Sequence, residues 1–188
     1  MRRNRFHPLM VAAVVLGLSG CGYNQIQTLD ERVNKGKADI SAQLQRRADL
    51  IPNLVNTVKG VTKQEDTVFI SIANARAKLS GAIQSGSPQQ MAEANEALNA
   101  PLGRLLAIAE AYPTLKSSEN FRALQDELTG TENRIAVART DYNGAVNDFN
   151  GYIRRFPYNI TAKIFGHSTP REYFQAQAGA EAAPEVKF

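Results

Sequence analysis

The sequence predicts an all-α protein, an antiparallel up-and-down four-helix bundle in which the first and last helices are long and the middle two are shorter. The strongest observation is an apolar stripe that recurs every three or four residues between Glu119 and Phe156, a coiled-coil-like seam. Such a helix is about 55–60 Å long and needs partners along its whole length. The stripe consists of Phe121, Leu124, Leu128, Thr131, Ile135, Ala138, Tyr142, Ala145, Phe149, Tyr152 and Phe156.

The second observation is another long apolar pattern, which begins near Tyr23 and has Gly36 as a weak point. Its best stop signal is Gly60, although a break between Asp49 and Pro52 is the competing interpretation. If the helix continues through Pro52, the proline ring leaves a carbonyl near Ala48 without its helical donor.

Two shorter helices are expected between the long ones. Thr62 to Glu65 resembles a capping box and predicts the start of a helix that runs to about Gln84. Ser87 followed by Pro88 predicts the next start, for a helix that runs to about Ala111. Ser117 or Ser118 then caps the last long helix.

The N-terminus predicts a bacterial lipoprotein signal. Three arginines precede a short apolar run, and Leu18-Ser19-Gly20-Cys21 matches the motif for cleavage between Gly20 and Cys21. The apolar run is shorter than the roughly 20 residues that span a bilayer. We expect residues 1–20 to be removed and Cys21 to carry a diacylglycerol and an N-acyl chain such as palmitate, a stable multi-chain anchor. The membrane is then a partner through this lipid.

The anchor predicts a place in the bacterial cell envelope, facing the periplasm. Gly22 follows the cysteine where inner-membrane retention typically has Asp, which favours the outer membrane if the host has one. Three of the 22 basic residues and none of the 18 acids lie in the signal, so the net charge falls from +4 to +1 on cleavage. A nearly neutral chain argues against nucleic acid as a partner.

The domain division that follows has three parts. Residues 1–20 form the signal, 21–157 the helical bundle, and 158–188 a C-terminal tail that packs near the membrane-proximal end and is partly mobile. Because the two shorter helices cover only the distal half, this tail is expected to cover the rest. Residues 170–174 are compatible with a short helix.

The densest polar cluster combines residues of both long helices. Its members are Arg46, Arg47, Asp49, Asn53, Glu132, Asn133 and Arg134. Antiparallel pairing places Glu132 opposite Arg46. One interpretation is a pocket or contact surface for a ligand or partner; the other is a buried layer that fixes helix register.

Catalytic and metal-binding patterns are absent from the sequence. It has two histidines, His7 in the signal and His167 in the tail, and no phosphate loop, zinc-protease helix or nucleophile elbow. The neighbouring acids Asp126 and Glu127 are expected on a solvated face. We therefore predict no metal, no cofactor beyond the covalent lipid and no enzymatic activity.

Several motifs resemble the LemA family. They include Leu44-Gln45-Arg46-Arg47-Ala48-Asp49-Leu50-Ile51-Pro52-Asn53-Leu54-Val55, Glu110-Ala111-Tyr112-Pro113, Gly130-Thr131-Glu132-Asn133-Arg134-Ile135-Ala136, and the tail Pro184-x-Val186-x-Phe188. The resemblance implies a bacterial, membrane-associated helical bundle without established enzymatic activity. Relatives usually carry an N-terminal transmembrane helix, which a lipoprotein signal replaces here.

Three functions remain open at this level, of which the third is bilayer shaping through the basic and aromatic residues near the lipid end, among them Arg154, Arg155 and Lys163. The first is a non-enzymatic interaction or scaffold protein that binds another envelope protein. The alternative is a small-ligand-binding or enzymatic bundle with a polar pocket at the Pro52 kink, formed by Arg47 and Glu132. A deep pocket with a perturbed acid beside Pro52 would favour the alternative, and a packed bundle with an exposed groove would favour the first.

Overall fold

The computed structural model describes residues 6–62 and 65–175, with side chains from Gly22 onward. This part of the chain is all-helical, as predicted, but it holds six helices rather than four, because two short ones follow the predicted third and last helices. The helices are α1 (Phe6–Lys59), α2 (Asp66–Ser85), α3 (Pro88–Glu110), α4 (Pro113–Lys116), α5 (Glu119–Ile153) and α6 (Tyr158–Ile164).

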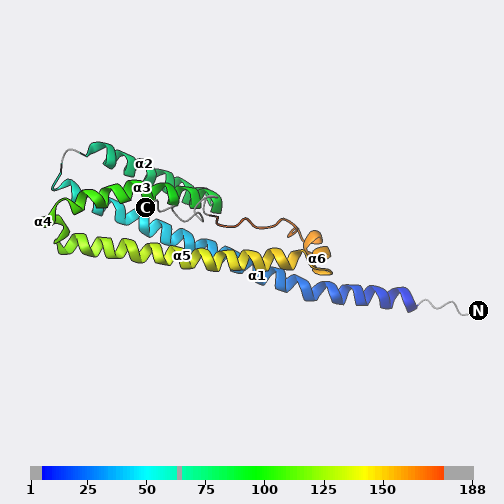
Figure 1. Cartoon of the computed structure of the whole chain (residues 1–188). Helices are drawn as coiled ribbons and strands as arrows, with labels where there is room; N and C mark the ends of the chain where they lie inside the picture. Colours follow the sequence, from blue (N-terminus) through cyan, green and yellow to red (C-terminus); the bar gives the residue numbers. More distant parts are fainter. Residues whose placement is uncertain (1–5, 63–64, 176–188) are drawn as a thin grey trace, which may run out of the picture.

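The long helices α1 and α5 lie side by side and run in opposite directions (Figure 1). The hairpin of α2 and α3 packs on the half of α1 that is farther from the N-terminus, and α4 is the one-turn link into α5. At the opposite end α6 packs on α1 and α5, and the N-terminal part of α1 projects beyond it (Figure 1). The molecule is therefore an elongated rod.

The break after α1 falls at Gly60, so the competing break near Pro52 is wrong. Pro52 lies inside the helix. The predicted capping box is also wrong: α2 begins at Asp66, and its N-cap residue Glu65 makes no side-chain capping bond. Thr62 is instead buried in the turn, where its N–H donates to the carbonyl of Val58.

The cap of α3 is as predicted. The Ser87 hydroxyl accepts a hydrogen bond from the backbone N–H of Gln90, and Pro88 occupies the first turn. Pro101 stays within the helix. Ser118 occupies the N-cap position of α5.

The buried stripe of α5 follows the predicted seam as far as Phe149, but near the C-terminus it also takes in residues outside the seam. Phe121, Thr131 and Tyr142 are buried as expected, but near the C-terminus Val146 and Ile153 are buried while Phe156 is 79% exposed. A straight helix drifts by about 20° per heptad against a 3.5-residue repeat. Over five heptads this drift moves the buried position by about one residue, and α5 ends before Phe156.

The half of the helix pair nearer the N-terminus of α1 is covered by α6 and by the segment that follows it. After α6 the chain runs back along α1 and α5 in extended form, and Phe174 is buried there. The short helix expected at 170–174 is therefore wrong. The regular helix lies at Tyr158–Ile164 instead, directly after the α5 terminus.

Candidate functional site

Arg47, the central member of the predicted polar cluster, is buried between α1, α3 and α5. It is 2% exposed, and its guanidinium donates to Asn95 Oδ1 at 2.5 Å and to Asn99 Oδ1 at 2.8 Å. Glu132 Oε1 lies 4.0 Å from Nη2, and Arg47 Nε has no hydrogen-bond partner among the described residues. Burial lowers the pKa of Arg47, against the opposing effect of Glu132. The arrangement is a structural layer that joins α3 to α1.

Arg46 lies on the surface and pairs with Glu127, not with Glu132 as the antiparallel register predicted. Arg46 Nε donates to Glu127 Oε1 at 2.8 Å, and Arg134 Nη2 donates to the same oxygen at 2.8 Å. The hydrogen bond from Arg46 is the main cause of the lowered pKa of Glu127. Glu127, Thr131 and Arg134 share one stripe of α5 that faces α1, so Glu127 is not on a fully solvated face.

The other predicted members spread out from this layer. Asp49 is exposed and accepts a hydrogen bond from Gln45 on its own helix. Asn53, Glu132 and Asn133 are exposed as well. The predicted cluster is thus a buried arginine, a surface ion-pair network and several separate solvated side chains.

The backbone carbonyl that Pro52 deprives of its helical donor receives a hydrogen bond from another helix. Pro52 leaves the carbonyl of Ala48 without a helical donor, and Arg76 of α2 donates to that oxygen from Nε at 2.8 Å. Ala48 itself is buried. The carbonyl predicted to be free therefore anchors α2 to α1.

Sequence reasoning missed Arg76, Asn95 and Asn99. The two asparagines had a usable signal: they are spaced i, i+4 in a helix otherwise rich in Ala and Leu, so they share one face. A polar pair on a packed face requires a polar partner, and Arg47 is that partner. Arg76 carries no comparable pattern.

An open groove of about 370 Å³ lies between α1 and α5. Its lining residues are Gly36, Asp39 and Gln43 from α1, and Asn133, Arg134, Val137, Ala138 and Asp141 from α5. Val137 is 61% exposed. The groove therefore combines an exposed apolar residue with two carboxylates and the guanidinium of Arg134. It includes two members of the predicted cluster, Asn133 and Arg134, but not Arg47 or Pro52.

Gly36, which lines this groove, is a point of close approach between α1 and α5. A Cβ atom at Gly36 would lie 3.1 Å from Tyr142 Cα, so the absence of a side chain lets α1 and α5 approach closely. Expected from the sequence only as a weak helix position, Gly36 is a close-contact position between the two long helices.

The returning C-terminal segment is held through its backbone. Asn150 donates to the carbonyl of Arg171 at 2.9 Å and accepts from its N–H at 2.7 Å, and Asn143 pairs in the same way with Phe174. The hydroxyl of Tyr142 donates to the carbonyl of Glu172 at 2.7 Å, and burial raises the pKa of Tyr142. These contacts fix the segment on α5.

Two side-chain contacts fix the segment on α1. Arg171 forms an ion pair with Asp30 at 2.6 Å, and the His167 ring lies 3.0 Å from the amide nitrogen of Gln27. His167 thus has a packing role at this end of the rod.

The predicted lipidation site lies at the edge of the described structure. Gly20 and Cys21 fall within the backbone of α1, but their side chains are outside the described residues, as is the Pro184-x-Val186-x-Phe188 motif. Over the part of the chain described here, we find no helix both long and apolar enough to cross a bilayer. No three acidic, histidine or cysteine side chains in this part cluster in a way that could hold a metal ion.

A pair of long antiparallel helices, braced by a helical hairpin and a buried arginine layer, defines an all-helical bundle protein. The LemA family model matches residues 36–188, and the chain belongs to that family.

Among curated proteins, the chain is similar to magnetosome proteins MamQ 1 and MamQ 2 of Paramagnetospirillum magneticum. Each is 28% identical over 207 residues, which cover 95% of this chain and 76% of the relative. It is also similar to magnetosome protein MamQ of Magnetospirillum gryphiswaldense, 26% identical over 200 residues that cover 91% of this chain and 74% of the relative.

Proposed function

We propose that this protein is a lipid-anchored, non-enzymatic scaffold of the bacterial envelope that presents the groove between α1 and α5 to a protein partner. Membership of the LemA family and similarity to magnetosome proteins favour a membrane-associated protein without catalytic activity. The anchor proposed is the lipid on Cys21, on the periplasmic side, with the outer membrane favoured in a host that has one.

The observation that carries the scaffold proposal is the groove itself. It is open, lies on the two longest helices, and places Val137 beside Asp39 and Asp141. At about 1.5 Å per residue, Gly36 to Gln43 lie roughly 22–33 Å along α1 from Cys21. A rigid helix therefore holds the groove away from the bilayer, where a periplasmic protein segment with apolar and basic side chains can reach it.

The geometry at Pro52 does not favour the ligand-binding alternative. The Arg47 guanidinium is directed to Asn95 and Asn99, and Glu132 is exposed. Because the acid with the lowered pKa, Glu127, pairs with two surface arginines, its shift has a structural cause.

The test is photo-cross-linking in native membranes from positions 137 and 70. Ile70 is the matched control for Val137, because the two residues are 60% and 61% exposed and lie on different helices. A discrete protein cross-linked from position 137, absent from position 70 and lost in Asp141→Lys, is the expected result. Equal cross-linking from both positions, or only lipid and self contacts, would contradict the scaffold proposal.

A further inference from the structure

The end of the rod formed by α6 exposes an unusual amount of apolar surface. Phe156, Ile160, Ile164 and Phe165 are 79%, 51%, 68% and 49% exposed. Ile160 and Ile164 are one turn apart on α6 and share a face. Exposed apolar side chains gathered in one place mark a surface that contacts another phase or another molecule. We call these four residues and the three basic residues described next the basal patch.

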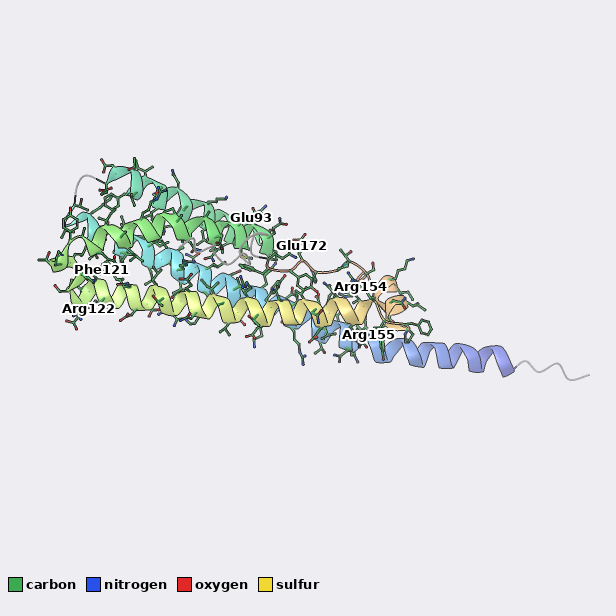
Figure 2. All side chains as sticks on the ribbon, in the orientation of Figure 1. Glu93, Phe121, Arg122, Arg154, Arg155 and Glu172 are labelled. Atoms are coloured by element: carbon green, nitrogen blue, oxygen red, sulfur yellow. The ribbon has the colours of Figure 1, made fainter. Side chains whose placement is uncertain are left out.

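The charges around these side chains have one sign. Arg154, Arg155 and Lys163 are exposed, and none forms an ion pair with another described residue. The sequence has no Asp or Glu between Asp148 and Glu172. Figure 2 shows Arg154 and Arg155 beside α6, at the opposite end of the rod from Phe121 and Arg122. The patch therefore joins apolar and basic groups without an acid among them.

The basal patch also lies next to the proposed anchor. A Cβ atom at Gly22 would be 2.8 Å from the Tyr158 ring, and the rings of Tyr23 and Phe165 have centroids 4.6 Å apart. Gly22 directly follows Cys21. A lipid on Cys21 would thus bring α6 to the bilayer surface with no linker between them.

We propose that the basal patch rests on an anionic phospholipid surface. Phe156, Ile160, Ile164 and Phe165 enter the boundary between headgroups and acyl chains, where amphipathic surface elements bind. Arg154, Arg155 and Lys163 lie at the level of the phosphates, since basic side chains are attracted to anionic lipids. The inference rests on the proposed anchoring and adds a second contact, which fixes the angle of the rod.

The test places single spin labels on the full-length, membrane-extracted protein in vesicles of phosphatidylethanolamine and phosphatidylglycerol. Ile160→Cys reports the basal patch, and Val137→Cys is the control because it is exposed on mid-α5. The protein without an added cysteine gives the blank for Cys21. We expect relaxation by an aqueous nickel complex to be several-fold weaker at position 160 than at position 137, with the reverse order for oxygen.

Flotation of the same vesicles separates the two proposals. If the protein floats but the label at position 160 is relaxed by nickel as strongly as the label at 137, the basal contact is wrong and the anchoring stands. If the protein does not float, both are wrong. The vesicles contain no other protein, so a protein that shields the label at position 160 can only be a second copy of this chain. A dimer of the protein in detergent would therefore overturn the lipid assignment.

A separate set of variants tests the contribution of the basic residues to the membrane contact. Arg154→Gln, Arg155→Gln and Lys163→Gln together remove the basal charges, and Arg104→Gln, Lys116→Gln and Arg122→Gln remove as many exposed charges at the distal end. In vesicles with phosphatidylglycerol, we expect the label at position 160 to be shielded from the nickel complex. The basal variant should lose this shielding, and the distal variant should keep it. Protection that is the same without phosphatidylglycerol would overturn the anionic assignment. Circular dichroism confirms that both variants are folded.

Discussion

Arg76 Nε donates a hydrogen bond over 2.8 Å to the backbone carbonyl of Ala48, the oxygen that Pro52 leaves without a helical donor. One long helix thus carries a proline in its interior, and a neighbouring helix supplies the missing donor. The contact explains how α1 remains continuous to Lys59, and it makes α2 part of the stability of α1.

Arg76→Met is expected to lower the free energy of unfolding by about 1–3 kcal/mol, because a buried carbonyl loses its donor. Urea denaturation measures the loss, and Lys78→Met is the control because Lys78 is exposed on the same helix. Pro52→Ala restores a backbone N–H, so it should stabilise the Arg76→Met protein more than the wild type. An equal effect of Pro52→Ala in both backgrounds would contradict the coupling.

Arg47→Met is expected to destabilise the bundle by about 2–3 kcal/mol, since the half-buried Asn95 and Asn99 then lose their charged donor. Adding Asn95→Leu and Asn99→Leu should recover part of this loss, because an apolar layer of similar volume often replaces a buried polar one. Thermal and chemical unfolding of both proteins measure the difference. If the triple variant is no more stable than Arg47→Met, the loss of the charged donor to the two asparagines does not explain the destabilisation.

Gly36→Leu is expected to destabilise by about 1–3 kcal/mol, because the new side chain meets the backbone of α5 at Tyr142 and forces the long helices apart. Gly144→Leu is the matched control: Gly144 is exposed on α5 with nothing within 4 Å of an added Cβ. For Gly144→Leu we expect the free energy of unfolding to rise by about 0.5–1 kcal/mol, because leucine has the higher helix propensity. Similar effects at both positions would remove the close-contact explanation.

Asn150→Ala should release the returning C-terminal segment. The variant loses two hydrogen bonds to the backbone of Arg171, each worth about 1 kcal/mol, so the Arg171 amide should exchange about tenfold faster or more. Hydrogen-exchange mass spectrometry of residues 168–175 measures this rate. Asn147→Ala, at an exposed position on the same helix, is the control. Unchanged exchange in Asn150→Ala would show that the two hydrogen bonds of Asn150 do not hold the segment.

The sequence predicted the helices well where the signal is local. The end of α1 at Gly60, the Ser87 cap and the free carbonyl of Ala48 each depend on a few neighbouring residues. Phe156 was misplaced because the apolar pattern was extended past Ile153, where α5 ends. The predicted capping box failed because Thr62 is buried in the turn after α1 and the next helix begins only at Asp66.

The partners of the polar cluster were harder to predict, because they depend on how the helices face one another. Arg46 pairs with Glu127 and Arg47 with two asparagines of α3, and no spacing within α1 indicates either. The extended path of residues 170–174 was missed for the same reason, because it depends on contacts with another helix. Asn143 and Asn150 replace the hydrogen bonds that a helix there would have made internally.

The intact mass of the protein purified from membranes decides whether a lipid on Cys21 holds this rod at the membrane. We expect a mature chain that begins at Cys21 and carries a diacylglyceryl group and an N-acyl chain, with neither cleavage nor lipid in Cys21→Ser. A chain that retains residues 1–20, or an unmodified Cys21, would contradict it.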